Sequence, residues 1–370
     1  MPKSDDESPL YPYDGVLLQS FGGPEGPDEV LPFLRRVTAG RGVPDERLVE
    51  VGEHYDRVGG VSPLPALNRR LVADLAAELT ERGHPLPVVL GNRNSAPFVA
   101  DALEQLSAAG ATRVAVIPTS GWRSYSSCRQ YREGLAEAVT EHPDLVLDKI
   151  RPFGEHPGFA GTFARDTLTA TREAVAAVGA EAVALLFITH SIPDAMDETS
   201  GPGDGEGRAY SADQAETAAA ILAEVDTALG VDLPGGLAFC SRSGSPRTPW
   251  LEPDVNDRLR ELAEEGHVEH VVLVPLGFIS DHMEVVHDLD VEAAETAAQL
   301  GLAHTRVPTP GTDPAFVAGL ADLLLERAGQ ARGEDPVRAT WRDLDSHPSR
   351  CPLGCCPNLQ TARPALCGED

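Results

Sequence analysis

Short, uninterrupted apolar runs recur along this chain, and longer amphipathic stretches separate them. Because the runs contain few polar residues, strands formed by them must be covered on both faces, as in a parallel sheet flanked by helices. The intervening stretches, such as NRRLVADLAAELTERG, place apolar residues at three- and four-residue intervals and end in glycine, which is typical of helices. The predicted strands form two sets: residues 15–21, 86–92 and 112–118, then residues 182–190, 236–241 and 270–276.

The two sets of strands predict an α/β protein built from two similar halves. With 370 residues, the chain is long enough for two domains of ordinary size. We expect a flexible N-terminal tail (1–12), a first half (13–152), a second half (153–330) and a Cys-rich C-terminal tail (331–370). The last helices of the second half can pack back on the first.

The charge balance limits the partners of the chain. A formal net charge of −28 argues against binding to nucleic acid or to an acidic membrane, since both need basic patches. No apolar run approaches the roughly 20 residues that span a bilayer. The sequence MPKSDDESPLYPYDG is polar and acidic, unlike a secretory signal peptide, so a cytoplasmic protein is expected.

Polar segments follow most of the predicted strands, where ligands bind in open α/β sheets. Among them are SFGGPEGP, TSGWRSYSSCRQY, THSIP, SRSGSPRTPWL and GFISDHMEVVHDLD, which one cleft between the two halves can collect. His190 ends the fourth strand, and a neutral imidazole serves as a base or a metal ligand near pH 7. A purely structural role for His190 is the alternative.

An acidic row follows the last predicted strand. If a helix begins near Ser280 or Asp281, then Glu284, Asp288 and Glu292 share one face and extend over about 12 Å. Like charges at this spacing repel one another. The row therefore either faces water or handles cations or protons.

The cysteines are unevenly placed, and disulfides between them are not expected in a reducing compartment. Cys128 and Cys240 lie in the body of the chain, whereas the last twenty residues contain Cys351, Cys355, Cys356 and Cys367. The spacing fits neither a CxxC…CxxC zinc site nor the plant-type cluster pattern. Metal binding by the tail is still the preferred interpretation, and Cys240, inside a predicted strand, is expected in the core.

Taken together, these segments resemble the ferrochelatases, which insert iron into porphyrins. The resemblance rests on FGGPEGPDEVLPFL, HYDRVGGVSPL, GNRNSAPFVADAL, THSIP, SRSGSPRTPWLEP and LGFISDHMEVVHDLD, in that order. It implies two Rossmann-like, chelatase-type domains, each a parallel sheet flanked by helices, with the active-site cleft between them. SYSSCRQY and the Cys-rich end resemble the bacterial branch that acts on coproporphyrin III and carries a [2Fe–2S] cluster.

The resemblance implies roles for the polar residues. His190 and Glu284 match the iron-binding and proton-handling pair, placed on opposite faces of the porphyrin, and which of them delivers iron stays open. Asp288 and Glu292 match a metal path, with a solvated acidic face as the alternative for Glu292. The residues implied near the porphyrin are Ser62, Tyr131 or Tyr125 as an axial ligand, Arg41 and Tyr55 near propionates, and Phe21, where some relatives have an iron-ligating tyrosine.

For the cluster, the resemblance implies Cys128, Cys351, Cys367 and either Cys355 or Cys356 as ligands, with a role in stability or redox sensing. The expected activity is insertion of Fe²⁺ into coproporphyrin III to give coprohaem, with enzymes of haem biosynthesis as further partners. The alternatives are protoporphyrin IX as substrate, another tetrapyrrole metal chelatase, and a haem carrier without activity. Chelatases for cobalt usually place a second histidine where this chain has Glu284.

Overall fold

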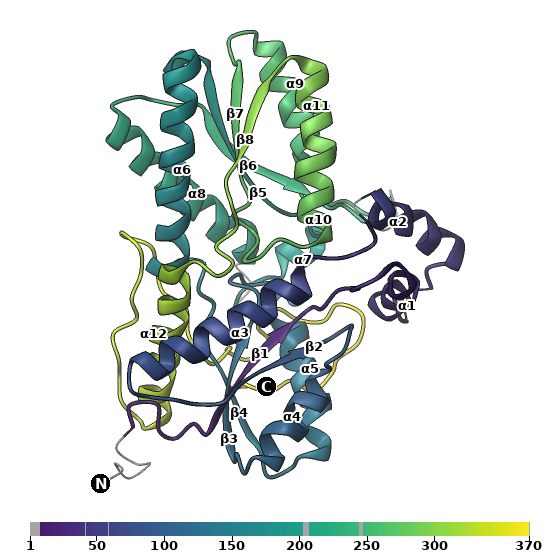
Figure 1. Cartoon of the computed structure of the whole chain (residues 1–370), viewed down its shortest axis with the longest axis vertical. Helices are drawn as coiled ribbons and strands as arrows, with labels where there is room; N and C mark the ends of the chain where they lie inside the picture. The colour runs from purple at the N-terminus through teal and green to yellow at the C-terminus, as the bar shows by residue number, and fades with distance from the viewer. Residues whose placement is uncertain (1–7, 41, 58, 203–206, 244–246, 370) are drawn as a thin grey trace.

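The computed structural model describes residues 8–40, 42–57, 59–202, 207–243 and 247–369, and it contains two parallel sheets of four strands each (Figure 1). The first sheet has the order β2-β1-β3-β4, with β1 (Gly15–Ser20), β2 (Val88–Asn92), β3 (Arg113–Pro118) and β4 (Val146–Lys149). The second has the order β6-β5-β7-β8, with β5 (Val183–His190), β6 (Gly235–Cys240), β7 (His270–Val274) and β8 (Ala303–Arg306). The predicted α/β architecture is confirmed.

Each sheet places its first strand in the middle, between two parallel neighbours. Val16 of β1 is paired with Val88 on one side and with Ala115 on the other. Every residue of β1 is buried, and β5 is buried up to His190, which is only partly covered. The mostly apolar composition of these strands is therefore explained by helices on both faces of each sheet.

Helices connect the strands and cover the sheets (Figure 1). In the first half they are α1 (Pro27–Val37), α2 (Asp45–Arg57), α3 (Leu64–Glu81), α4 (Val99–Ala108), the π-helix η2 (Tyr125–Arg129), α5 (Gln130–Ala138) and the 3₁₀ turn η3 (Val139–Glu141). In the second half they are α6 (Pro157–Val178), the 3₁₀ turn η4 (Ala180–Ala182), α7 (Asp194–Glu198), α8 (Ala209–Leu229), α9 (Val255–Glu265), α10 (Met283–Val285), the π-helix η5 (Val286–Ala293), α11 (Ala294–Leu300) and α12 (Pro314–Ala331).

Helix α12 packs back on the first half. Arg82, just after α3, forms an ion pair with Asp322 of α12 at 2.6 Å, and the buried Arg151, just after β4, pairs with Glu326 of α12 at 3.0 Å. The tail after α12, yellow in Figure 1, runs back to the first sheet, where the backbone N–H of Leu366 donates to the carbonyl of Arg132. The end of the chain thus joins the two halves.

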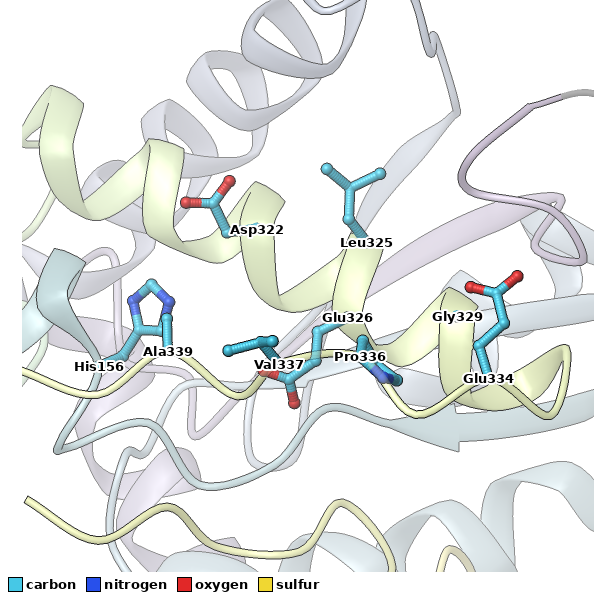
Figure 2. A pocket seen from close by; sticks show the side chains of 9 residues that line it. All are labelled: His156, Asp322, Leu325, Glu326, Gly329, Glu334, Pro336, Val337 and Ala339. Carbon is cyan, nitrogen blue, oxygen red and sulfur yellow. The ribbon is translucent and has the colours of Figure 1, made fainter.

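A pocket between α12 and the start of the tail is part of this junction (Figure 2). Its lining consists of His156, Asp322, Leu325, Glu326, Gly329, Glu334, Pro336, Val337 and Ala339. Each of its three carboxylates pairs with an arginine, namely Arg82, Arg151 or Arg332. The acidic lining is therefore neutralised by the protein itself.

Two elements and one helix boundary differ from the sequence prediction. Strands β4 and β8 were not predicted, because VLDK and AHTR are short, partly polar edge strands without the apolar run that marks the others. The helix expected near Ser280 begins at Met283 and continues as a π-helix. Among the helices of the described residues, none combines the length and apolar character needed to cross a bilayer.

Candidate active site

His190 lies at the carboxyl end of the buried strand β5 and projects toward Glu284. Its Nδ1 is 2.5 Å from the carbonyl oxygen of Ser191, so Nδ1 carries the hydrogen and donates it. In the neutral ring, Nε2 then holds the free lone pair, and it lies 3.7 Å from Oε2 of Glu284. Both side chains remain accessible, with exposed fractions of 32% and 51%. The imidazole therefore presents its basic nitrogen to a carboxylate and to the solvent.

The start of α10 fixes the position of Glu284. His282 is the N-cap of this helix, and its Nδ1 accepts hydrogen bonds from the backbone N–H groups of Glu284 (3.2 Å) and Val285 (3.4 Å). The ring of His282 also packs edge-on against Phe278, with 5.2 Å between centroids. Sequence reasoning missed His282, although a side chain that accepts hydrogen bonds just before a helix is a typical N-cap signal.

The pair is electrostatically coupled. Burial lowers the pKa of His190, but the charge of the nearby Glu284 carboxylate and the carbonyl of Ser191 outweigh burial and raise it above its usual value. Burial raises the pKa of Glu284, but His190 and His282 outweigh it and lower the pKa to about 2. Glu284 therefore stays anionic at neutral pH, and a proton taken up by His190 is stabilised.

A second polar group extends the site along η5. Nδ1 of His287 lies 3.3 Å from Oδ1 of Asp288 and 3.9 Å from Oε1 of Glu292, and one ligand atom from each of the three lies within 4.8 Å of the others. The hydroxyl of Ser241, just after β6, donates to Oδ2 of Asp288. These three side chains can hold a cation together.

Sequence reasoning placed Asp288 and Glu292 correctly next to each other but missed His287. In a π-helix, hydrogen bonds join residues five apart, so His287 and Glu292 share a face. Spacing rules for an α-helix group Glu284, Asp288 and Glu292 instead. The hydrogen bond to Asp288 raises the pKa of His287, and burial raises the pKa of Glu292.

Aromatic residues from the first half pack beside α10. The ring of Phe33 in α1 packs edge-on against Phe21 and Tyr55, with centroids 6.0 and 6.4 Å apart. Met283 of α10 joins the same apolar cluster. Burial raises the pKa of Tyr55, and the nearby carboxylate of Glu284 raises it further. Phe21 and Tyr55 therefore lie at the side of the site that α1 and α2 provide.

Arg93, which follows β2, was not predicted to be a site residue. It contacts two residues that were predicted, Phe21 and Tyr131. Its guanidinium carbon lies 5.9 Å from the ring centre of Phe21 and 5.0 Å from that of Tyr131. Such cation–π contacts hold a positive charge beside two aromatic rings. Arg41, the other arginine expected here, lies outside the described residues.

Tyr125 and Ser62 have local partners. The hydroxyl of Tyr125 donates to Glu133 at 3.2 Å and accepts from the amide of Asn358 at 2.8 Å, which ties it to the C-terminal tail. Ser62 is buried at the start of α3, where its hydroxyl accepts from the N–H of Leu64 at 3.4 Å. A Cβ added to Gly23 would lie 2.9 Å from Ser62, so the SFGGPEGP turn passes directly over this serine.

Four cysteines meet in a buried cluster, which we call the cysteine pocket: Cys128, Cys351, Cys355 and Cys356. The Sγ atoms of Cys128 and Cys351 are 3.9 Å apart, and those of Cys355 and Cys356 are 3.7 Å apart. Two thiolates bound to one tetrahedral ion at about 2.3 Å are about 3.8 Å apart, so these pairs fit a thiolate-bound metal. The hydrogen bond from Cys128 is the largest of the effects that lower the pKa of Cys351.

The composition of the cysteine pocket differs from the ligand set that the resemblance implied. Adjacent Cys355 and Cys356 both take part, because Cys356 has a positive φ of 49° that turns the backbone between them. Cys367 lies outside the pocket, and its Sγ donates to the carbonyl of Leu147 at 3.3 Å. Cys240 is buried in the core of the second half, as expected.

The fold and the site together define a class of protein: a metal-handling enzyme with two parallel α/β domains and a histidine–carboxylate pair beyond the strand ends. The family model "Ferrochelatase" matches residues 13–328. The chain belongs to the ferrochelatase family.

Full-length relatives and solved structures add detail. The chain is 47% identical over 366 residues to a coproporphyrin III ferrochelatase of Streptomyces griseus, covering 97% of each sequence. It is 48% identical to a coproporphyrin III ferrochelatase of Frankia alni, covering 94% of this chain and 87% of the relative. Among solved structures, SirB from Bacillus subtilis with Fe³⁺ matches 86% of this chain and 98% of its own, with a TM-score of 0.48 and 12% identity.

Proposed function

We propose that this protein inserts Fe²⁺ into coproporphyrin III and releases coprohaem. The relatives that match nearly the whole chain carry this activity in their names. The observation that carries the proposal is the contact of 3.7 Å between Nε2 of His190 and Oε2 of Glu284 beyond the strand ends. It brings together a proton acceptor and a fixed anion, which are the two groups that the reaction needs.

Metal insertion replaces two pyrrole N–H protons with one divalent ion. His190 accepts a pyrrole proton at Nε2, because Nδ1 is already bonded to Ser191. Glu284 remains anionic, so it stabilises the imidazolium that forms and attracts the incoming cation. General bases act best within hydrogen-bond reach of the proton that they remove, and Nε2 is the ring nitrogen of His190 that faces Glu284.

The geometry changes one expectation from the resemblance, which placed His190 and Glu284 on opposite faces of the ring. A flat macrocycle between two side chains needs a gap of about 7 Å, since each face makes a van der Waals contact of about 3.5 Å. The two side chains are only 3.7 Å apart. We infer that both address the same face of the porphyrin, with α1 and α2 toward the other face.

The cation reaches the pair along η5. His287, Asp288 and Glu292 offer mixed nitrogen and oxygen ligands, which suit a divalent iron ion. Because Asp288 is also held by Ser241, it is oriented before any metal arrives. A partly hydrated ion can therefore pass from these carboxylates to Glu284.

The opposite wall binds the macrocycle. Phe21 and Tyr55 offer apolar surface, and Arg93, together with Arg41 outside the described residues, supplies guanidinium groups for propionates. Tyr131, packed against Arg93, is the better axial ligand than Tyr125, whose hydroxyl is already bonded to Glu133 and Asn358. Ser62 positions the turn that carries Phe21.

The cysteine pocket is the proposed site of a [2Fe–2S] cluster, with Cys128, Cys351, Cys355 and Cys356 as ligands. When bound, the cluster supplies one-electron redox chemistry, which metal insertion itself does not use. Iron and acid-labile sulfide are expected in the parent and in Cys367→Ser, but not in Cys355→Ser or Cys356→Ser. Loss of the cluster in Cys367→Ser and in only one of Cys355→Ser and Cys356→Ser would instead support the ligand set implied by the resemblance. The cytoplasmic location and the partner enzymes of haem biosynthesis remain predictions.

The activity is tested without air, with Fe²⁺ and coproporphyrin III, by following the change from the free-base to the haem absorption spectrum. His190→Ala is expected to lose metal insertion while it retains its far-UV circular dichroism. His267→Ala is a matched control, because it removes a histidine 3.9 Å from Glu265 at an exposed site away from the cleft. Full activity of His190→Ala would contradict the role of His190. A higher rate with protoporphyrin IX than with coproporphyrin III would contradict the proposed substrate.

A further inference from the structure

The peptide bond between His190 and Ser191 is held at both of its polar atoms. In a strand, carbonyl groups two residues apart point to the same side. The carbonyl of Ile188 accepts the N–H of Gly277 at 3.0 Å, just after β7, whereas the carbonyl of His190 lies beyond the end of that strand. On the other side, the N–H of Ser191 donates to the carbonyl of Cys240 at 2.8 Å. The carbonyl of His190 therefore takes its partner from outside the sheet.

Tyr210, in the first turn of α8, supplies this partner. Its hydroxyl donates to the carbonyl of His190 at 2.8 Å and lies 3.0 Å from Oγ1 of Thr189. Tyr210 is 3% exposed and Thr189 is 0% exposed, so both contacts are shielded from water. A Cβ added to Gly277 would lie 2.3 Å from Oγ1 of Thr189, so the segment after β7 packs directly against this threonine. Tyr210 thus holds the last two residues of β5.

The orientation of the imidazole follows from this peptide bond. Nδ1 of His190 donates to the carbonyl of Ser191 at 2.5 Å. A rotation of the peptide bond moves this acceptor and, with the ring, Nε2, which lies 3.7 Å from Oε2 of Glu284. Tyr210 and Cys240 oppose such a rotation, because they bond the two polar atoms of the peptide. Tyr210 therefore acts on the imidazole through the backbone.

The start of α8 is bonded in turn to the cysteine pocket. The backbone N–H of Tyr210 donates to Oγ of Ser200 at 2.9 Å, and Ser200 is 0% exposed. The next residue, Gly201, bonds Cys356 twice: its N–H donates to Sγ at 3.2 Å, and its carbonyl accepts the N–H of Cys356 at 3.0 Å. Gly201 has a φ of 97°, and a Cβ there would lie 2.7 Å from Cβ of Ala209. A continuous series of hydrogen bonds therefore leads from the cysteine pocket to the carbonyl that Tyr210 holds.

We propose that Tyr210 is a positioning residue for His190, and that the contact between Gly201 and Cys356 makes this position depend on an intact cysteine pocket. The inference rests on the proposed role of His190 in metal insertion. A displacement of about 1 Å from the reactive geometry can lower a rate about 100-fold. Loss of the Tyr210 hydroxyl should therefore slow proton removal without weakening the binding of either substrate.

The first test removes the hydroxyl of Tyr210 and keeps its ring. In Tyr210→Phe, kcat for metal insertion is expected to fall about tenfold, with the KM for Fe²⁺ and for coproporphyrin III unchanged. The NMR signals of the His190 imidazole, recorded without substrate, should shift. Tyr13→Phe is the matched control, because Tyr13 is also buried and its hydroxyl donates to Asp148 at 3.2 Å, on the first sheet. It should keep the parental kcat and the parental signals of His190.

The second test is a double-mutant cycle on kcat. Contacts that belong to one network do not add, whereas independent ones do. Cys356→Ala is expected to lower kcat about fivefold in the parent and less than about twofold in the Tyr210→Phe background. Ser200→Ala breaks the middle of the path and leaves every cysteine in place, so the same pattern is expected from it even if Cys356→Ala loses the folded tail. Cys367→Ser, outside the cysteine pocket, is the control and should leave kcat unchanged in both backgrounds.

The results that would overturn the inference are distinct. Unchanged kcat and imidazole signals in Tyr210→Phe, or equal losses in Tyr210→Phe and Tyr13→Phe, would remove the positioning role of Tyr210. Full additivity of Ser200→Ala and of Cys356→Ala with Tyr210→Phe would remove the link to the cysteine pocket. A parent protein that inserts iron into no porphyrin would overturn the proposed function instead, whereas imidazole signals that shift in Tyr210→Phe and not in Tyr13→Phe would still support the positioning of His190.

Discussion

At the scale of single residues, the site depends on the coupling of His190 and Glu284. Oε2 of Glu284 lies 3.7 Å from Nε2 of His190, and the carboxylate holds the pKa of the imidazole above its usual value. A group whose pKa is raised on folding stabilises the folded state at low pH, and this contribution is lost as pH rises through the raised pKa. Protonation of His190 also removes the lone pair on Nε2 that accepts a pyrrole proton.

Replacing Glu284 by Gln should therefore lower the pKa of His190. In the parent, the rate of metal insertion is expected to rise with pH through a midpoint above the usual value for histidine, and Glu284→Gln should move this midpoint to lower pH. The imidazole titration is measured by NMR without substrate, and the pH–rate profile with coproporphyrin III and Fe²⁺. Identical midpoints in the two proteins would contradict the coupling.

The carboxylates of η5 give a second prediction at this scale. Asp288→Asn should raise the KM for Fe²⁺ about tenfold, because loss of a group at a metal site typically costs about 10–100-fold in affinity. The KM for the porphyrin should stay unchanged. Asp290→Asn is the control, since Asp290 lies on the same π-helix but pairs with Arg306 at 2.6 Å. Equal effects of the two variants would argue for a general loss of negative charge.

At the scale of elements, the sequence predicted the apolar strands, but it missed the short edge strands and the π-helix. The six apolar runs correspond to β1, β2, β3, β5, β6 and β7, because strands covered on both faces have few polar residues. The edge strands β4 and β8 are short and partly polar, so they have no such signal. His287 lies on the same face as Glu292 because this segment is a π-helix. The wider turn of a π-helix is not predicted by α-helical spacing.

The strand β5 and the helix α8 are joined by a hydrogen bond beside the active site. The hydroxyl of Tyr210, in α8, donates to the carbonyl of His190 at 2.8 Å. Tyr210→Phe is expected to lower the free energy of unfolding by about 1 kcal/mol, a typical value for one hydrogen bond. Urea unfolding followed by circular dichroism measures this change. Tyr11→Phe, at an exposed position, should be neutral, and an equal loss in both would contradict the assignment.

At the scale of the whole molecule, α12 and the tail hold the two halves together. Arg151, whose side chain is 0% exposed, pairs with Glu326 of α12 at 3.0 Å and also with Glu155, and it donates to the carbonyl of Ala339 in the tail. The domain boundaries at residues 152 and 330 stay predictions, but the last helix of the second half contacts the first. The packing of the two halves therefore depends on contacts made by the end of the chain.

Arg151→Met should destabilise the protein by about 3–5 kcal/mol, because it leaves buried carboxylates without a partner. Arg342→Met removes an exposed ion pair with Glu224 and should cost only about 0–1 kcal/mol. Urea denaturation measured by tryptophan fluorescence compares the two. Equal midpoints for both variants would show that the buried ion pairs do not hold the halves together.

The most direct test of the account is a crystal structure of the protein with coproporphyrin III bound. Nε2 of His190 and the carboxylate of Glu284 are expected on the same face of the ring, directed toward its pyrrole nitrogens, with Phe21 and Tyr55 on the other side. A macrocycle lying between His190 and Glu284, or bound away from both, would contradict it.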